Sequence, residues 1–192
     1  MNIDNIKIQI KDKMKHLNKI CIALFALLFA STSQMVYAQS APSFNDAEIA
    51  SIAVTANDID IKYGELALTK TKNKEITNFA KTMINDHKAV IQQAVDLVTK
   101  LKVTPQDNAL SKQLNADAET TRKMLSSKKG AAFNKAYIDN EVAYHEAVIG
   151  AVKDVLIPQS QNAELKALLE AVLPALETHL EHAKMVQKNI GG

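Results

Sequence analysis

The sequence predicts an all-α protein, an antiparallel four-helix bundle with one additional short helix. The main observation is that apolar residues recur every three or four positions through long segments of the chain. The chain of 192 residues has only five Gly, four Pro and 5% aromatic residues, which argues against a turn-rich β-sandwich or barrel. Hydrophobic residues make up 47% of the chain, enough for one core and too many for a disordered protein.

The N-terminal part of the chain has the pattern of a secretory signal peptide. Residues 1–19 are polar and basic, residues 20–30 are uninterruptedly apolar, and Val36–Ala38 resembles an A-x-A cleavage site. We expect residues 1–38 to be removed by cleavage near Ala38, with Met14 as an alternative start, and the protein to be exported to the periplasm or cell envelope. An uncleaved anchor is the alternative, but the apolar run is shorter than the roughly 20 residues of a membrane-spanning helix. We therefore expect no transmembrane segment in the mature chain.

We expect residues 39–45 to form a short exposed segment and residues 46–190 to form the helical bundle domain. Ser43 or Asn45 is the expected N-cap of the first helix. Pro174 lies inside the last helix and is expected to bend it, because proline removes a backbone donor and crowds the preceding turn. The five expected helices cover about residues 46–71, 74–102, 108–127, 131–156 and 162–188.

Composition excludes several classes of function. The net charge of +2 comes from the basic leader, and the rest of the chain has nearly balanced charge, so a nucleic-acid-binding surface is not expected. Cys21 is the only cysteine and lies in the leader, which excludes disulfides and cysteine-based sites from the mature chain. The sequence contains no phosphate-binding glycine loop, no G-x-S-x-G and no H-E-x-x-H. It also lacks the E-x-x-H pairs of di-iron bundles.

Three histidines occupy core positions of the expected bundle. His87, His145 and His179 each belong to a run of apolar residues spaced alternately by three and four, which is typical of a helix packed in an antiparallel bundle. Each lies near the middle of its helix, and mid-helix positions stay level whatever the helix direction. We therefore expect the three imidazoles within one or two turns of a common layer, at about 5.4 Å per turn.

A layer of imidazoles in an apolar core needs hydrogen-bond partners or a metal ion. Glu141 precedes His145 by one helical turn and shares its face, and Glu65 can approach from the first helix. Asp60, Tyr63 and Tyr144 lie at a similar level. His87, His145 and His179 are candidate ligands of one transition metal, with Glu141 and Glu65 as further candidate ligands or hydrogen-bond acceptors. Such ligands suit Zn, Cu or Fe and do not discriminate among them.

Two other interpretations remain open. The histidines can be hydrogen-bonded core groups that fix the register of a metal-free structural or interaction protein. Alternatively, the cluster can serve a redox or hydrolytic enzyme, which requires an open coordination position and a pocket that reaches solvent. Because no catalytic motif is present, the sequence favours a non-enzymatic envelope protein whose partner is another envelope protein or a second copy of the chain.

Three groups of residues carry a resemblance to a known family. They are Asn73, Phe79, Ala80, Met83, Asp86 and His87 in the second helix; Gly130, Phe133, Tyr137 and His145 in the fourth; and Leu173, Pro174, Leu176, His179, Leu180 and Ala183 in the fifth. From about Phe44 to Lys188 the chain resembles the exported, ferritin-like proteins of domain of unknown function 4142, often labelled outer-membrane proteins. The resemblance implies a ferritin-like bundle and export. It implies no established activity and no catalytic residues.

Overall fold

Five α-helices make up most of the chain between residues 42 and 191, the residues that this computed structural model describes. An additional π-helical turn, η1 (Val152–Leu156), and a short helix, α6 (Ile157–Gln159), follow α5 without a break. No strand occurs within the described range, so the predicted all-α class is confirmed. The expected signal peptide and its cleavage site near Ala38 lie outside the described residues. The five helices are α2 (Asp46–Lys70), α3 (Lys74–Leu101), α4 (Ala109–Ser126), α5 (Gly130–Ala151) and α7 (Ala163–Ile190).

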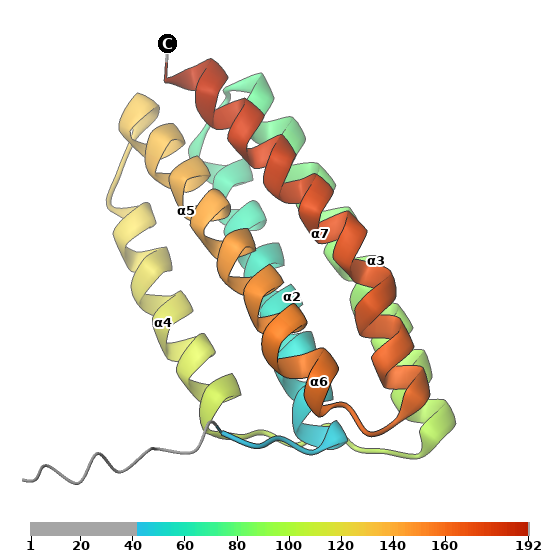
Figure 1. Ribbon diagram of the computed structural model, residues 1–192. Coiled ribbons are helices and arrows are strands. Elements are labelled where there is room, and N and C mark those ends of the chain that lie inside the picture. Colours follow the sequence, from blue (N-terminus) through green and yellow to red (C-terminus); the bar gives the residue numbers. More distant parts are fainter. Residues whose placement is uncertain (1–41, 192) are drawn as a thin grey trace, which may run out of the picture. The chain divides into compact units, whose positions relative to one another are not determined.

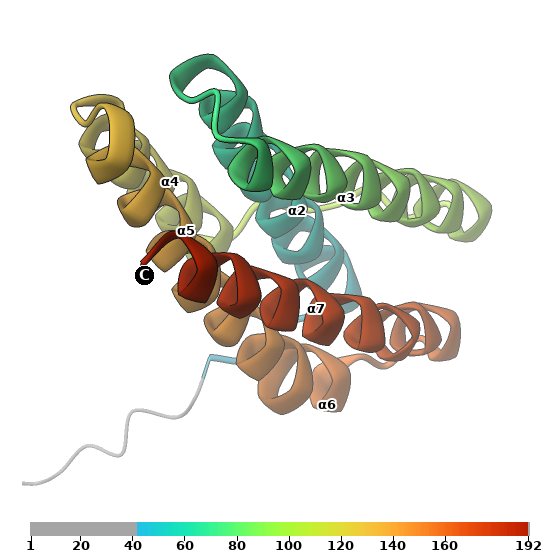
Figure 2. The same ribbon diagram turned by 90° about the horizontal axis from the view of Figure 1, so that it is seen from above.

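The four longest helices form the bundle, and α4 is the additional shorter helix. Helix α2 packs along α3, α5 packs along α7, and contacts of α3 with α7 and of α2 with α5 complete the arrangement. Helix α4 lies on the outside against α2 and α5 (Figure 1). Seen from above, α3 and α7 both extend toward the right-hand side of the view, beyond α2 (Figure 2). The predicted four-helix bundle with one extra helix is therefore confirmed.

Local capping signals set where the helices begin. The Asn45 side chain accepts a hydrogen bond from the Glu48 N–H, and the Glu48 carboxylate accepts one from the Asn45 N–H, each at 3.0 Å. This reciprocal capping box satisfies backbone donors that have no partner inside the helix. Of the two expected N-caps, Asn45 rather than Ser43 is the one used. Three further helices, α3, α4 and α7, are also capped by asparagine side chains: Asn73, Asn108 and Asn162.

The segment before α2 is less exposed than expected. Within the described part of residues 39–45, Pro42, Ser43 and Asn45 are exposed, but the Phe44 side chain is only 8% exposed. Its ring packs into the core, and its N–H donates to Oε1 of Gln159 at 2.7 Å. Burial of a large aromatic ring stabilises the fold, so the packed domain already begins at Phe44.

The fourth expected helix, over residues 131–156, is not α-helical to its end. Helix α5 ends at Ala151, and Val152–Leu156 form the π-helical turn. Such turns are rare and are found frequently at functional sites. The neighbouring helix α7 contacts η1 and continues through Pro174, which lacks the backbone donor that an α-helix needs there. The π-helical turn thus packs against the helix that contains Pro174.

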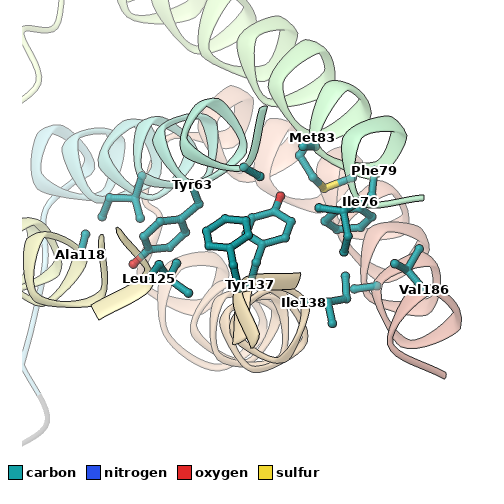
Figure 3. Close-up of a cluster of buried hydrophobic side chains, with 14 residues drawn as sticks. Tyr63, Ile76, Phe79, Met83, Ala118, Leu125, Tyr137, Ile138 and Val186 are labelled. Atoms are coloured by element: carbon teal, nitrogen blue, oxygen red, sulfur yellow. The ribbon is translucent and has the colours of Figure 1, made fainter. Parts of the chain in front are cut away.

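Two hydrophobic clusters fill the bundle at different heights. The first contains Phe79 of α3 and Tyr137 of α5, and Figure 3 shows Tyr137 in its middle. The second contains Ile49 of α2, Leu156 of η1 and Leu169 of α7. None of the helices between residues 42 and 191 combines the length and apolar character needed to cross a membrane.

Candidate metal centre

Polar side chains interrupt the core at one height, between the two hydrophobic clusters. On α5, His145 lies between Ile138 of the first cluster and Ile149 of the second. The equivalent level on the other three long helices is held by Asp60, His87 and His179. All four side chains are buried, and the ring centroids of the histidines lie 5.2–5.8 Å apart. The predicted layer of three imidazoles is confirmed.

Two of the imidazoles are oriented by oxygen acceptors on their own or a neighbouring helix. Nδ1 of His87 lies 2.7 Å from Oδ1 of Asn57, and Nδ1 of His145 lies 2.9 Å from the main-chain oxygen of Glu141. An amide or carbonyl oxygen only accepts, so the proton resides on Nδ1 of each ring. When neutral, both rings therefore present an unprotonated Nε2 at their other end.

The third imidazole is oriented the other way round. Nε2 of His179 lies 3.0 Å from Oδ2 of Asp86, to which it donates, so its lone pair is on Nδ1. Nε2 of His87, Nε2 of His145 and Nδ1 of His179 are all buried and have no hydrogen-bond partner among the described residues. These three nitrogens can act as ligands of one ion, because donor atoms of the three rings lie within 4.8 Å of one another.

Two carboxylates complete this group, which we call the histidine–carboxylate cluster: His87, His145, His179, Asp60 and Glu141. Oδ2 of Asp60 lies 3.0 Å from Nε2 of His87 and 3.4 Å from Nε2 of His145. Two ligand atoms that are each about 2.1 Å from one ion are separated by about 3.0 Å at a right angle and about 3.4 Å at the tetrahedral angle. Both oxygens of Asp60 and both of Glu141 are buried without a hydrogen-bond partner among the described residues. The spacing and the unpaired atoms therefore fit a coordination sphere.

Burial sets the electrostatics of the cluster. Burial and the nearby charge of Asp60 raise the pKa of Glu141 well above its ordinary value. Burial also raises the pKa of Asp60, but the close contact with His87 and the charges of the three imidazoles outweigh it and lower that pKa overall. The pKa values of His145 and His179 are lowered, again mainly by burial. Burial thus favours the protonated form of Glu141 and the neutral forms of His145 and His179, and Asp60 is the carboxylate that stays charged.

A tyrosine next to the cluster holds α5 against α2. The hydroxyl of Tyr144 donates to the main-chain oxygen of Ala56 at 2.9 Å, and its ring makes an edge contact with Tyr63 at a centroid distance of 5.6 Å. Both tyrosines are expected near the histidines from the sequence. Their contacts fix the part of α2 that carries Asn57 and Asp60.

The structure brings together four of the five residues predicted as metal ligands: His87, His145, His179 and Glu141. Glu65 is not among them, because its side chain is 57% exposed and its nearest cation is Lys88, with the two charged atoms 3.9 Å apart. Five residues along a helix turn a side chain by about 500°, or about 140° away from the starting face. Glu65 therefore points away from the direction of Asp60, which is the carboxylate that α2 contributes.

Sequence reasoning also missed the groups that orient the rings. Asn57 precedes Asp60 by three positions and so shares its face of α2, which is a signal that the spacing rule can detect. Asp86 adjoins His87 in sequence, but it bonds to His179 of another helix. Only the packing of α3 against α7 reveals that pairing.

A cavity of about 530 Å³ adjoins the cluster. Its lining includes Asp60, His87, His145 and His179, and otherwise consists mainly of aliphatic side chains from several helices. Binding sites for small molecules commonly have volumes of about 300–1,000 Å³. An ion in the cluster could therefore keep a coordination position open towards this space.

Comparison with known proteins gives one match. The family model described as Domain of unknown function (DUF4142) matches residues 31–186, a range that contains every residue of the histidine–carboxylate cluster. No curated protein and no solved structure matches the chain. The match covers most of the sequence and confirms the resemblance found in the three groups of helical residues. The chain belongs to the DUF4142 family.

Proposed function

We propose that this protein is an exported envelope protein that binds one divalent transition metal ion, such as Zn²⁺, Cu²⁺ or Fe²⁺, in the histidine–carboxylate cluster. His87, His145, His179 and Asp60 act as ligands, and Glu141 is a further ligand or a hydrogen-bond acceptor beside them. One observation carries the proposal: each of three clustered histidines has one ring nitrogen hydrogen-bonded and the other buried without a partner among the described residues, and two of these unpaired nitrogens lie 3.0 and 3.4 Å from Oδ2 of Asp60.

This pattern favours a metal site over a hydrogen-bonded polar layer. A buried polar atom without a partner costs about 1–3 kcal/mol, so native cores rarely contain several together unless an ion or water satisfies them. The groups that hold the other ring nitrogens are an amide, a main-chain carbonyl and a carboxylate. Acceptors of these kinds fix the tautomer and direction of histidines that bind metals.

Metal content tests the proposal directly. Residues 39–192 should be exported to a periplasm, purified without a His-tag and analysed by inductively coupled plasma mass spectrometry. We expect close to one transition metal ion per chain in the wild type and none in the triple variant His87→Ala/His145→Ala/His179→Ala. His182→Ala is the matched control, because it removes a histidine from α7 outside the cluster and should leave the metal content unchanged. A metal-free wild type that takes up no Zn, Cu or Fe on titration would overturn the proposal.

The cavity favours a second candidate, a metal-dependent enzyme that uses the same cluster. Catalytic metal sites keep a ligand position open to substrate, and the lining of the cavity includes all three histidines. The visible spectrum of the Co²⁺-substituted protein tests this position with azide as the probe. We expect azide to shift the cobalt bands in the wild type; a spectrum unchanged at saturating azide would show that the coordination sphere is closed.

A further inference from the structure

The second half of α3 is packed differently from its first half. Ile76, Phe79 and Met83 in the first half are fully buried, and His87 is the last buried residue of the helix. No side chain of the helix beyond it is buried, and Val90, Ala94 and Leu97 are half-buried. The apolar periodicity of the sequence continues through these three residues, which the rest of the bundle covers only in part. These side chains face the cavity.

The cavity is long and begins at the histidine–carboxylate cluster. On α3 its lining extends from Asp86 to Val98, which corresponds to about 18 Å of helix at 1.5 Å per residue. On α7 it extends from His179 back to Leu165, about 21 Å in the same direction, because α7 runs antiparallel to α3. The π-helical turn η1 contributes Val152 to the wall. The part of the cavity between α3 and α7 therefore extends along the bundle, and further lining comes from α2, α4 and α5.

The residues that line the cavity are polar near the histidine–carboxylate cluster and aliphatic along the second half of α3. Polar residues occur only at and around the level of the cluster, whereas every lining residue of α3 after His87 and of η1 is Ala, Val, Ile or Leu. No aromatic side chain lies in that aliphatic part, so it offers no flat surface on which a ring could stack. No Lys or Arg lines any part of the cavity, so an anionic head group would have to be paired by an ion in the cluster.

We propose that the cavity binds one linear fatty acid of about twelve carbons, with its carboxylate at the histidine–carboxylate cluster and its chain along the second half of α3. An extended chain advances about 1.3 Å per carbon for C–C bonds of about 1.5 Å, so twelve carbons span about 15 Å and fit within the length of the lining. The position of the carboxylate rests on the proposed metal site, because the metal supplies its positive partner. Binding of the chain rests on the aliphatic walls alone.

Calorimetric titration of the Zn²⁺-loaded protein with octanoate, decanoate and dodecanoate tests the proposal. We expect one site per chain and an affinity that rises about fourfold for each added methylene, the gain from burying one such group. Ala94→Trp fills the cavity from α3 and should weaken dodecanoate binding at least tenfold while leaving the zinc content unchanged. Val95→Trp is the matched control, because Val95 is the next residue on the same helix, is 44% exposed and does not line the cavity.

Further experiments distinguish a failure of the fatty-acid proposal from a failure of the proposed metal site. Val172→Trp fills the cavity from α7 and replaces Ala94→Trp if that variant does not fold, as judged by circular dichroism. Removal of zinc should weaken dodecanoate more than dodecanol, because only the carboxylate needs the ion. Absence of saturable binding by dodecanoate, or equal binding by the wild type and both filled variants, would overturn the fatty-acid site whatever the zinc content. A dimer that Ala94→Trp dissociates, without any dodecanoate binding, would also overturn it and would assign the aliphatic face to a second copy of the chain.

Discussion

Nε2 of His87 lies 3.0 Å from Oδ2 of Asp60 in the interior of the bundle, and neither atom has a hydrogen-bond partner among the described residues. The proton of His87 is held at the far side of its ring by Asn57, so the Nε2 lone pair faces the carboxylate oxygen. Two electron-rich atoms this close repel each other unless a proton or a cation lies between them. The same oxygen of Asp60 lies 3.4 Å from Nε2 of His145. Asp60 is therefore the residue on which metal binding should depend most.

Asp60→Asn should abolish metal binding without unfolding the metal-free protein. The amide keeps the shape of the side chain, and its N–H can donate to the unprotonated Nε2 of His87, so we expect the metal-free variant to remain folded. The wild type should gain thermal stability when Zn²⁺ is added, because the ion binds only the folded state. That gain should be lost in the variant, as measured by melting with and without Zn²⁺.

Glu65→Gln is the control for this change, since Glu65 is an exposed carboxylate on the same helix. It should retain the full zinc-dependent rise in melting temperature. A rise in Asp60→Asn as large as that of the wild type would show that Asp60 is not a ligand.

Asp86→Ala should weaken metal binding although Asp86 does not belong to the cluster. Its carboxylate accepts a hydrogen bond from the Nε2–H of His179 and so directs Nδ1 of that ring to the other ligands. Loss of an outer partner of this kind typically reduces metal affinity about 10–100-fold. Competition with a zinc chelator measures the affinity, and Asp96→Ala, an exposed change on the same helix, should have no effect. Equal affinities of the two variants would contradict the orienting role of Asp86.

The fold is predictable from the sequence because the signals that specify it are local. Asn45 with Glu48 marks the start of α2 through contacts within four residues, and the three–four spacing of apolar residues marks the buried face of each long helix. The π-helical turn was not predicted, since its residues continue the same apolar spacing as α5. The burial of Phe44 was also missed, because it depends on Gln159, more than a hundred residues away.

The candidate site is only partly predictable for the same reason. The three histidines occupy core positions of regular helices, so their common level follows from helix geometry alone. The choice between Asp60 and Glu65 depends on how α2 is rotated about its axis, and the weak three–four pattern of this helix leaves that rotation open. The cavity could not be predicted at all, because Val90 and Ala94 continue the apolar pattern of α3 as though another helix covered them.

The metal-free protein should lose stability below about pH 6.5 through His145 and His179. Burial lowers the pKa of both imidazoles in the folded state, whereas in the unfolded chain they titrate near their ordinary value of about 6.5. The unfolded chain therefore binds more protons in this range, so the free energy of unfolding falls as pH decreases from about 6.5 through the folded-state pKa values. The slope is at most about 1.4 kcal/mol per pH unit for each imidazole.

Glu141 has the opposite effect on the pH dependence of the free energy of unfolding. It therefore has to be replaced before the effect of the two histidines can be measured. Its folded-state pKa is raised, so its contribution to stability is complete below its unfolded value and is lost as pH rises through the folded value. Urea unfolding of metal-free Glu141→Gln between about pH 5 and pH 7.5 should show the rise in stability with pH. His145→Gln/His179→Gln in the same background should flatten it. A slope that survives both substitutions would have to arise from other groups.

Metal binding near pH 7 should release about one proton from Glu141 when this carboxylate becomes a ligand. Burial and the charge of Asp60 favour the protonated form of Glu141 in the metal-free cluster, and a ligating carboxylate has to be ionised. Calorimetry of Zn²⁺ binding in buffers with different ionisation enthalpies counts the protons released. Glu141→Gln should release about one proton fewer than the wild type. Equal numbers for the two proteins would place Glu141 outside the coordination sphere or show it ionised before the metal binds.

Gly64→Ala and Gly150→Ala should change stability in opposite directions, although both replace a glycine whose backbone is helical. Alanine has a higher helix propensity than glycine by about 1 kcal/mol. At Gly150 an added Cβ meets no atom within 4 Å, so that variant should be more stable.

At Gly64 the Cβ would lie 2.9 Å from Cγ1 of Ile84 and 3.1 Å from the main-chain oxygen of Ala80. The oxygen belongs to the backbone of α3 and cannot turn away, so α2 and α3 would have to separate. Overpacking of this kind costs about 1–3 kcal/mol, more than the gain in propensity. Urea unfolding of the metal-free proteins measures both changes, and a stabilised Gly64→Ala would show that α2 and α3 are not in such close contact at this point.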